Sequence, residues 1–520
     1  MKRSLFRSTS LVGGMTLLSR VLGFARDVTF AQIFGAGVVM DAFFVAFKIP
    51  NFMRRLFAEG AFSQAFVPVL GEVKAQGGEA EVRDFINRVC GTLSLVLAIV
   101  TAIGIVAAPI FIYIFAPGFT DDPNRYALSV AMLRLTFPYL LFISLTALAG
   151  GILNTYGRFG VPAFTPVILN IILIAAAIWL APLLPRPGLA LAWGVLIAGA
   201  VQLAFQVPFL WRLRLLPRPR LAGRHPAVRR TLRLMLPALF GSSVSQINML
   251  ADTLIASFLV TGSVSWLYYS DRLMEFPLGV FAIALATVIL PGLSAHHAER
   301  KPEAFSATLD WALRLALVVV LPAAVGLFML AGPLIATLFR YGEFGTHDVQ
   351  MAQWSLMAYS VGLVGFTLVK ILAPGYYARQ DIRTPVRVGV IAVVANIVFN
   401  AAITAPLALL GFRAPHAGLA LSTSLAAFVN AGLLYWGLRR SGVYRAAGGW
   451  LLLIIRVVVA NAAMAVMLAF GVGPLSLWFG WSGLGRAWHL AVWVVAAVAV
   501  YFGVLALIGL RPRHLRAAGD

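Results

Sequence analysis

Charged residues and cysteine are both scarce in this sequence of 520 residues. Only 12% of the residues are charged, whereas an average soluble protein carries about 25%. Hydrophobic residues make up 61%, and the mean hydropathy is +0.90. A single cysteine, Cys90, excludes an internal disulfide and a cysteine-rich metal site. The composition therefore predicts a polytopic membrane protein and excludes a soluble fold.

Signatures of catalysis and of ATP hydrolysis are also missing. The seven histidines are scattered in or beside predicted loops, without metal-ligand spacing. No Walker loop of the form G-x-x-x-x-G-K-[ST] occurs. We therefore expect a protein that is not an enzyme and has no cofactor. Any transport would draw on a sodium or proton gradient, or on the membrane potential.

Acidic residues are few: 19 Asp and Glu stand against 41 Lys and Arg, for a net charge of +22. A crossing needs about 20 apolar residues, and such windows begin near residues 8, 40, 88, 128, 160, 187, 232, 265, 308, 348, 386, 415, 450 and 487. Lys and Arg collect in alternate connections between these fourteen windows. The positive-inside rule then predicts two cytoplasmic termini. Because the basic residues are shared among many loops, nucleic-acid binding is excluded.

The longest basic loop runs from Trp211 to Arg233 and has a proline-rich centre. Leu and Trp among its arginines favour a segment on the inner leaflet, beside anionic membrane lipids. A solvated linker, kept inside by its charge, explains the same composition.

Short matches recur at an offset of 230 residues. Gly188-Leu189-Ala190-Leu191 returns as Gly418-Leu419-Ala420-Leu421, Asn170 matches Asn400, and Asp41 matches Asp271. Six predicted spans separate the copies, so both would have the same orientation, as in the parallel repeats of alternating-access transporters. We expect an N-lobe over 1–225, a C-lobe over 226–445, and a two-helix extension with a cytoplasmic tail over 446–520.

The segment from Gly13 to Gln64 carries charges inside apolar windows. A charge at bilayer depth costs at least about 2.5–3.5 kcal/mol, so such side chains usually face a bundle interior or a wet cavity. A second group in the segment SDRLMEFPLGVF places Asp271, Arg272 and Glu275 within one turn. The charged residues of the first segment are Arg20, Arg26, Asp27, Asp41, Lys48, Arg54, Arg55 and Glu59.

Helical spacing orients these charges. Arg20 and Asp27, seven residues apart, share a face, whereas Arg26 points about 120° away from Arg20. Arg55 and Glu59 are an i,i+4 pair. Several arginines in one place favour a phosphate, because the guanidinium fork gives paired hydrogen bonds and keeps its charge. We therefore predict a transporter with a cationic cavity and an anionic, phosphate-bearing substrate.

Structural roles explain some of the same residues. Arg54, Arg55 and Glu59 could lie at the cytoplasmic mouth, where long side chains reach the membrane surface. Asp41 could begin its helix near the outer surface. Arg272 and Glu275 could form a buried ion pair between the lobes.

A second polar set suits a hard cation. Asp252 lies in an apolar span, Asn396 and Asn400 share a face of a later one, and Thr423 follows in the next. A carboxylate with amide and hydroxyl oxygens is the ligand type that sodium prefers. The same groups could equally hold helices together by hydrogen bonds.

Five long segments carry charged or polar residues at unusual places: SRVLGFARD, FGAGVVMDAFFVAFKIPNFMRRLFAEGAFSQAFVPVL, GGILNTYGRFGVPAFTPVILN, SVSWLYYSDRLMEFPLGVF and LAPGYYARQDIRTPV. These segments resemble the MurJ/MviN family of lipid II flippases. The similarity covers about residues 8 to 510.

This resemblance implies an all-α fold of about fourteen transmembrane helices: two six-helix lobes around a central cavity and two C-terminal helices. It places the family in the multidrug/oligosaccharidyl-lipid/polysaccharide exporter superfamily. It implies transport of lipid II, the undecaprenyl-diphosphate-linked peptidoglycan precursor, to the outer leaflet of the cytoplasmic membrane. A groove at the last two helices would hold the polyprenyl tail. Family cavity residues match Arg20, Arg26, Asp41, Arg54, Glu59, Arg272 and Glu275, and the sodium ligands of some members match Asp252, Asn396, Asn400 and Thr423.

Other functions fit parts of the pattern. A flippase for another polyprenyl-diphosphate glycan would need the same cationic cavity, whereas a drug/cation antiporter would be repelled by it. A membrane glycosyl- or phosphotransferase would need acidic metal ligands on loops, for which Asp121-Asp122 is the one candidate pair. Other cell-wall synthesis proteins would be possible partners of a flippase.

Overall fold

The computed structural model describes residues 2–55, 62–221 and 225–510, and this part of the chain contains helices and no strand. Eleven helices in it are long and apolar enough to cross a membrane, and they match eleven of the predicted windows. The windows near residues 8, 40 and 232 fall on helices α1 (Lys2–Phe34), α2 (Val38–Arg54) and α10 (Pro226–Ser257). Helices are expected here because lipid leaves backbone N–H and C=O groups no water to bond. The predicted all-α, multi-span class is confirmed.

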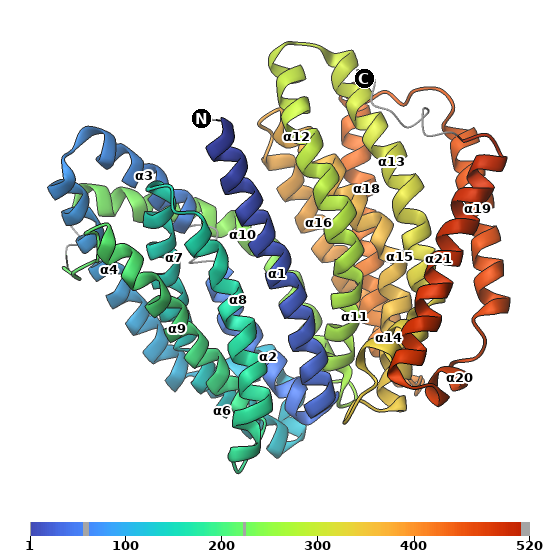
Figure 1. Cartoon of the computed structure of the whole chain (residues 1–520), viewed down its shortest axis with the longest axis horizontal. Helices are drawn as coiled ribbons and strands as arrows, with labels where there is room; N and C mark the ends of the chain where they lie inside the picture. The colour runs from blue at the N-terminus through green and yellow to red at the C-terminus, as the bar shows by residue number, and fades with distance from the viewer. Residues whose placement is uncertain (1, 56–61, 222–224, 511–520) are drawn as a thin grey trace. The chain divides into compact units, whose positions relative to one another are not determined.

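The chain divides into two compact units, Met1–Val264 and Ser265–Asp520. In the first unit α1 packs on α8, α2 on α6, and α9 on both α7 and α8 (Figure 1). Between α2 and α10 this unit contains α3 (Ser63–Gln76), α4 (Glu79–Val106), α5 (Ala108–Phe115), η2 (Pro117–Asp121), α6 (Pro123–Thr136), α7 (Tyr139–Thr155), α8 (Gly160–Ala175), η3 (Ala176–Leu180), η4 (Ala181–Leu183) and α9 (Leu189–Arg212).

The second unit is built around α15, which packs on α13 and α18, while α19 packs on α13 and α21. Figure 1 shows α19 and α21 in red, side by side. After α11 (Ser263–Pro277), which begins at the boundary, come η5 (Leu278–Ala282), α12 (Ile283–Ala298), α13 (Pro302–Met329), α14 (Ala331–Phe339), α15 (Thr346–Tyr377), α16 (Arg383–Phe399), η6 (Asn400–Thr404), α17 (Ala405–Leu409), α18 (His416–Arg440), α19 (Trp450–Gly471), α20 (Leu475–Gly480) and α21 (Gly483–Leu507).

Contacts within the chain group α10 with the first unit. The sequence repeat predicts instead that this helix opens the second lobe, at residue 226. The predicted limits at 225 and 445 describe the repeat and the extension, whereas the units describe packing, so those limits stay a prediction.

The helices repeat at an offset of 223 residues over much of the chain, and the predicted offset of 230 is wrong for them. Helices α4 and α13, both 28 residues long, begin at 79 and 302, and α6 and α15 begin at 123 and 346. Asp41 is the fourth residue of α2, whereas Asp271 is the ninth of α11. Asn170 lies inside α8, whereas Asn400 opens the π-helical segment η6. The matches at 230 therefore do not join equivalent positions.

Two polar contacts join equivalent positions of corresponding helices in the two units. Asp41, fourth in α2, binds Arg125, third in α6, at 2.7 Å. Trp266, fourth in α11, donates its indole N–H to Asp348, third in α15, at 2.9 Å. In each unit a polar link thus joins the start of one helix to the start of another, although the residue types differ.

Asn87 and Asp310 form a second equivalent pair, because each is the ninth residue of its helix, α4 or α13. The side-chain oxygen of Asn87 accepts the N–H of Arg218 at 2.7 Å. Asp310 accepts the N–H of Ala447 at 3.2 Å. Each side chain therefore fastens the loop that follows the helix α9 or α18 of its own unit.

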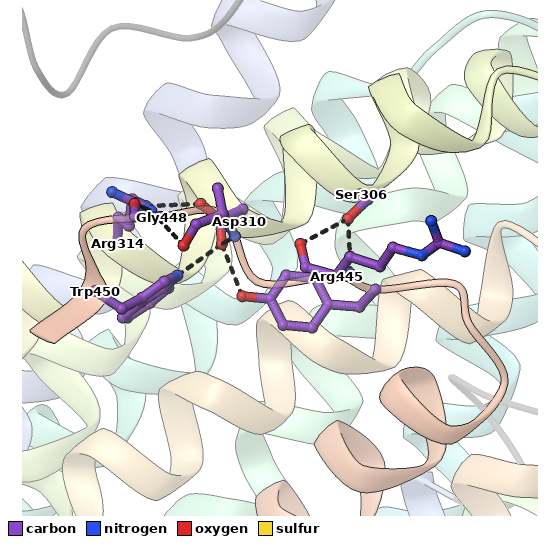
Figure 2. A network of polar contacts seen from close by, with 8 residues as sticks. Ser306, Asp310, Arg314, Arg445, Gly448 and Trp450 are labelled. Carbon is purple, nitrogen blue, oxygen red and sulfur yellow. Dashed lines mark hydrogen bonds and ion pairs between the residues drawn. The ribbon is translucent and has the colours of Figure 1, made fainter.

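Asp310 is the hub of a larger network on α13 (Figure 2). One carboxylate oxygen also accepts the Tyr444 hydroxyl at 2.8 Å and the Trp450 indole N–H at 2.7 Å, and the other accepts Arg314 at 2.6 Å. Arg314 in turn donates to the Gly448 carbonyl at 2.7 Å. The network fixes the chain that leads from α18 into α19, so it sets where the two-helix extension attaches.

Candidate functional site

The charges of α1 lie in two different environments. Arg20 is exposed and makes no hydrogen bond or ion pair with another described residue. Arg26 is only 6% exposed, and its guanidinium binds Asp27 at 2.6 Å and Asn170 of α8 at 3.0 Å. This difference agrees with the predicted rotation between Arg20 and Arg26. Arg20 can therefore meet an anion directly, whereas the charge of Arg26 is already compensated by Asp27.

Asp41 is fully buried near the start of α2. Its carboxylate accepts Arg125 at 2.7 Å and the backbone N–H of Gly262 at 2.7 Å. Arg125 is also buried, and its guanidinium lies 3.7 Å from the ring centre of Phe119. Asp41 therefore links α2, α6 and the loop before α11. This surrounding is that of a structural ion pair, and the predicted contact of Asp41 with substrate stays a prediction.

The other end of α2 is more open. Arg54 is half-buried and donates its Nε–H to the side chain of Asn51 at 2.9 Å, and Arg55 is exposed. Lys48 donates to the hydroxyl of Thr253 in α10 at 2.8 Å. The predicted pair between Arg55 and Glu59 is not tested, because Glu59 lies outside the described residues.

In the second unit Arg272 and Glu275 form an ion pair at 3.0 Å within α11. Their side chains are 36% and 51% exposed, so the pair is not buried. The guanidinium also lies 5.5 Å from the ring centre of Tyr268. An exposed pair of this kind is worth at most about 1 kcal/mol. Arg272 can therefore exchange Glu275 for another anion at little cost.

The predicted sodium ligands are divided between the units. Asn248 and Asp252 contact each other at 3.4 Å in the first unit. In the second unit Thr423 donates to Asn396 at 3.5 Å. Asn400, which follows Asn396 by four residues, is buried. Within the described residues no cluster of three or more His, Cys, Asp or Glu could hold a metal ion. Amide and hydroxyl oxygens suit sodium chemically, but the site stays a prediction.

A cleft of about 540 Å³ lies in the first unit. It is lined mainly by apolar side chains, including Leu11 of α1, Phe164 of α8 and Phe205 of α9, and also by Arg158. None of the predicted site residues lines it. Its lining suits a hydrocarbon chain better than a diphosphate.

Several polar residues were absent from the predicted site although the structure gives them important contacts. Arg125 and Asn170 hold Asp41 and Arg26, respectively. Each pair is joined across many residues of sequence, so helical spacing alone could not reveal it. The one available signal was that Arg125 and Asn170 are polar residues within or beside apolar windows.

Comparisons with known proteins agree along the whole chain. A family model described as "Lipid II flippase MurJ" matches residues 30–483. A Vibrio cholerae protein named "Probable lipid II flippase MurJ" is 47% identical over 100% of this chain and 99% of its own length. A Burkholderia cenocepacia "Lipid II flippase MurJ" is 44% identical over 99% of each chain.

Solved structures show the same fold. The structure titled "Lipid II flippase MurJ, inward closed conformation" has a TM-score of 0.79 at 26% identity, over 97% of this chain and 100% of the other. An inward-facing multidrug resistance transporter of the MATE family has a TM-score of 0.65 at 17% identity, over 83% and 98%. The second likeness concerns the fold alone.

Proposed function

The chain belongs to the family of lipid II flippases described as MurJ, and on this premise we propose that it carries lipid II from the inner to the outer leaflet of the cytoplasmic membrane. It is a multi-pass membrane protein and a transporter rather than an enzyme. Lipid II combines a charged diphosphate with a long apolar chain. A carrier for it must offer cations to the first and leave the second in lipid.

The exposed guanidinium of Arg20 is the observation that supports this proposal most directly. It stands on a helix of the first unit, and no described carboxylate neutralises it. An arginine fork can give two parallel hydrogen bonds to phosphate oxygens. Each hydrogen bond to a charged group is worth about 1.5–3 kcal/mol. Arg20 alone could therefore supply a large part of the free energy with which a diphosphate is bound.

Arg54 and Arg272 are the next cations that the proposal assigns to the diphosphate. Both are half-buried, and each has a partner that a phosphate oxygen could replace: the neutral amide of Asn51 for Arg54 and the partly exposed carboxylate of Glu275 for Arg272. We also assign Arg26 to this site, in a supporting role, because it lies on α1 with Arg20 but its charge is already compensated by Asp27. The two lobes would alternate between inward-open and outward-open states around the bound diphosphate, while the polyprenyl chain stays in lipid.

Resetting the empty carrier needs a source of free energy. The sequence has no ATP-binding loop, so we propose that membrane potential, protons or sodium supply it. Asp252 with Asn396, Asn400 and Thr423 is the candidate sodium set. Both termini would be cytoplasmic, and other cell-wall synthesis proteins would be partners.

A flippase for another polyprenyl-diphosphate glycan is the main alternative, because the diphosphate chemistry is identical. Purified protein in vesicles should be offered labelled lipid II and, in parallel, a labelled O-antigen precursor. Accessibility of each label at the opposite leaflet then reports transport. We expect transport of lipid II and little of the other lipid. Transport of the O-antigen precursor alone would contradict the proposal.

A further inference from the structure

Three residues of α1 lie on one face, next to Asn170 of α8. Ser19, Gly23 and Arg26 are spaced i, i+4 and i+7, which aligns them along a helix. Asn170 of α8 faces this row and is 5% exposed. Its side-chain N–H₂ donates to the Ser19 carbonyl at 3.0 Å, and its oxygen accepts Arg26 at 3.0 Å. One amide thus connects two points of α1 that are two turns apart.

The orientation of this amide follows from its partners. A carbonyl can only accept and a guanidinium can only donate, so the nitrogen must face Ser19 and the oxygen must face Arg26. Exchanging the two ends would place donor against donor at Arg26 and acceptor against acceptor at Ser19. The two contacts therefore support each other.

Gly23 leaves the space that the amide occupies. A Cβ atom added at Gly23 would lie 3.5 Å from the Asn170 nitrogen, in ordinary van der Waals contact. A side chain longer than alanine would extend into the volume of the amide. The close approach of Asn170 to the middle of the row therefore depends on a small residue at this position.

Arg26 is held from two sides. Asp27 accepts its Nε–H at 3.0 Å and an Nη2–H at 2.6 Å, and Asn170 accepts an Nη1–H. Three of the five N–H groups of the guanidinium are thereby fixed in direction. On the other side of the amide, Ser19 directly precedes the exposed Arg20. The same side chain of α8 therefore binds Arg26 directly and anchors the backbone carbonyl of the residue that precedes Arg20.

We propose that Asn170 is a positioning residue of the diphosphate site, which fixes Arg20 and Arg26 relative to α8 through the Ser19 carbonyl and the Arg26 guanidinium. This assignment rests on the proposed function. It predicts that removing the amide lowers the affinity for lipid II even when the protein remains folded. A residue that only joins two helices would lower stability alone.

The test compares buried amides in the same unit. Gln206 of α9 is 1% exposed and donates to the Thr146 carbonyl of α7 at 3.2 Å, so Gln206→Leu is the matched control. Lipid II affinity and thermal unfolding are measured on purified full-length protein in lipid nanodiscs. Asn170→Leu should weaken lipid II binding about tenfold, the equivalent of one charge-assisted hydrogen bond. Gln206→Leu should lower the unfolding temperature about as much as Asn170→Leu does. It should leave the lipid II affinity within about twofold of the wild-type value.

Two further variants separate the contacts. Asn170→Asp keeps an acceptor for Arg26 but places a carboxylate against the Ser19 carbonyl, so it should recover only the part of the affinity that depends on Arg26. Gly23→Leu should weaken binding as Asn170→Leu does, because it displaces the amide. Wild-type affinity for Asn170→Leu, or equal losses in Asn170→Leu and Gln206→Leu, would overturn the assignment. If the wild-type protein itself failed to bind lipid II, the proposed function would fail instead, and the two failures are therefore distinguishable.

Discussion

The buried ion pair between Asp41 and Arg125 leads to a prediction about a residue that the sequence assigned to substrate binding. Both side chains are at most 4% exposed, and Asp41 also accepts the N–H of buried Gly262. Removing one partner of a buried pair costs about 3–5 kcal/mol, because the other charge is left without compensation. Asp41→Leu should therefore destabilise the protein by about that amount.

The double variant Asp41→Leu, Arg125→Met should recover much of this loss. Replacing both charges of a buried pair by apolar side chains is often neutral or stabilising. The N–H of Gly262 still loses its acceptor, at a cost of about 1–3 kcal/mol. The double variant should thus be about 2 kcal/mol more stable than the single one, although it carries an additional substitution.

Thermal unfolding of the purified proteins in one detergent measures this order, and growth of a flippase-depleted strain measures function. If Asp41 acts only by joining α2 to α6, the double variant should restore growth that the single variant loses. A double variant no more stable than the single one would refute the ion-pair reasoning. A stable double variant that cannot support growth would return Asp41 to the substrate site.

Three other predictions concern the loops. Asp310→Leu removes four hydrogen bonds that the carboxylate accepts. It should lower the free energy of unfolding by more than about 3 kcal/mol and speed proteolysis between α18 and α19. Unchanged proteolysis would contradict the role of the network. Gly91→Ala would place a Cβ against the Arg220 carbonyl oxygen, closer than van der Waals contact allows. Trypsin should therefore cleave after Arg220 faster than in the wild type, and equal rates would show that the loop is not held there. Hydrogen bonds from Thr384 hold the pKa of Asp381 below its usual range. This cap therefore stabilises the fold above about pH 4, and its contribution is lost as the pH falls through the lowered pKa. The stability difference between the wild type and Asp381→Ala should shrink in acid, and a difference independent of pH would be inconsistent with the cap.

The helical class was predictable because lipid imposes a simple rule on the backbone. Apolar windows of about 20 residues located the eleven confirmed spans, and the charged windows also proved helical. The offset of the internal repeat was harder to predict from the sequence. It is set by the residues at which the helices begin, whereas the four-residue identity at Gly188 and Gly418 indicated an offset of 230. In an apolar chain built from few residue types, short identities arise by chance and do not mark structural equivalence.

The candidate site was predictable as far as one helix can show it. A rotation of 100° per residue separated Arg20 from Arg26, and the structure places one outside and the other against α8. Partners on other helices were not predictable. Arg125 lies 84 residues from Asp41, and Asn170 lies 144 from Arg26. No helical spacing rule applies to residues so far apart in sequence. The three-dimensional structure was therefore needed to distinguish an exposed arginine from one that is already paired with a carboxylate.

Arg20 provides the most direct test of the central claim, that an exposed arginine of α1 binds the diphosphate of lipid II for transport. A strain depleted of its own flippase should be supplied with the wild-type gene or with Arg20→Ala, and growth and protein level should be measured together. We predict that Arg20→Ala accumulates in the membrane at the wild-type level and fails to support growth, with lipid II accumulating inside the cell. Full growth on Arg20→Ala at equal protein level would contradict the claim.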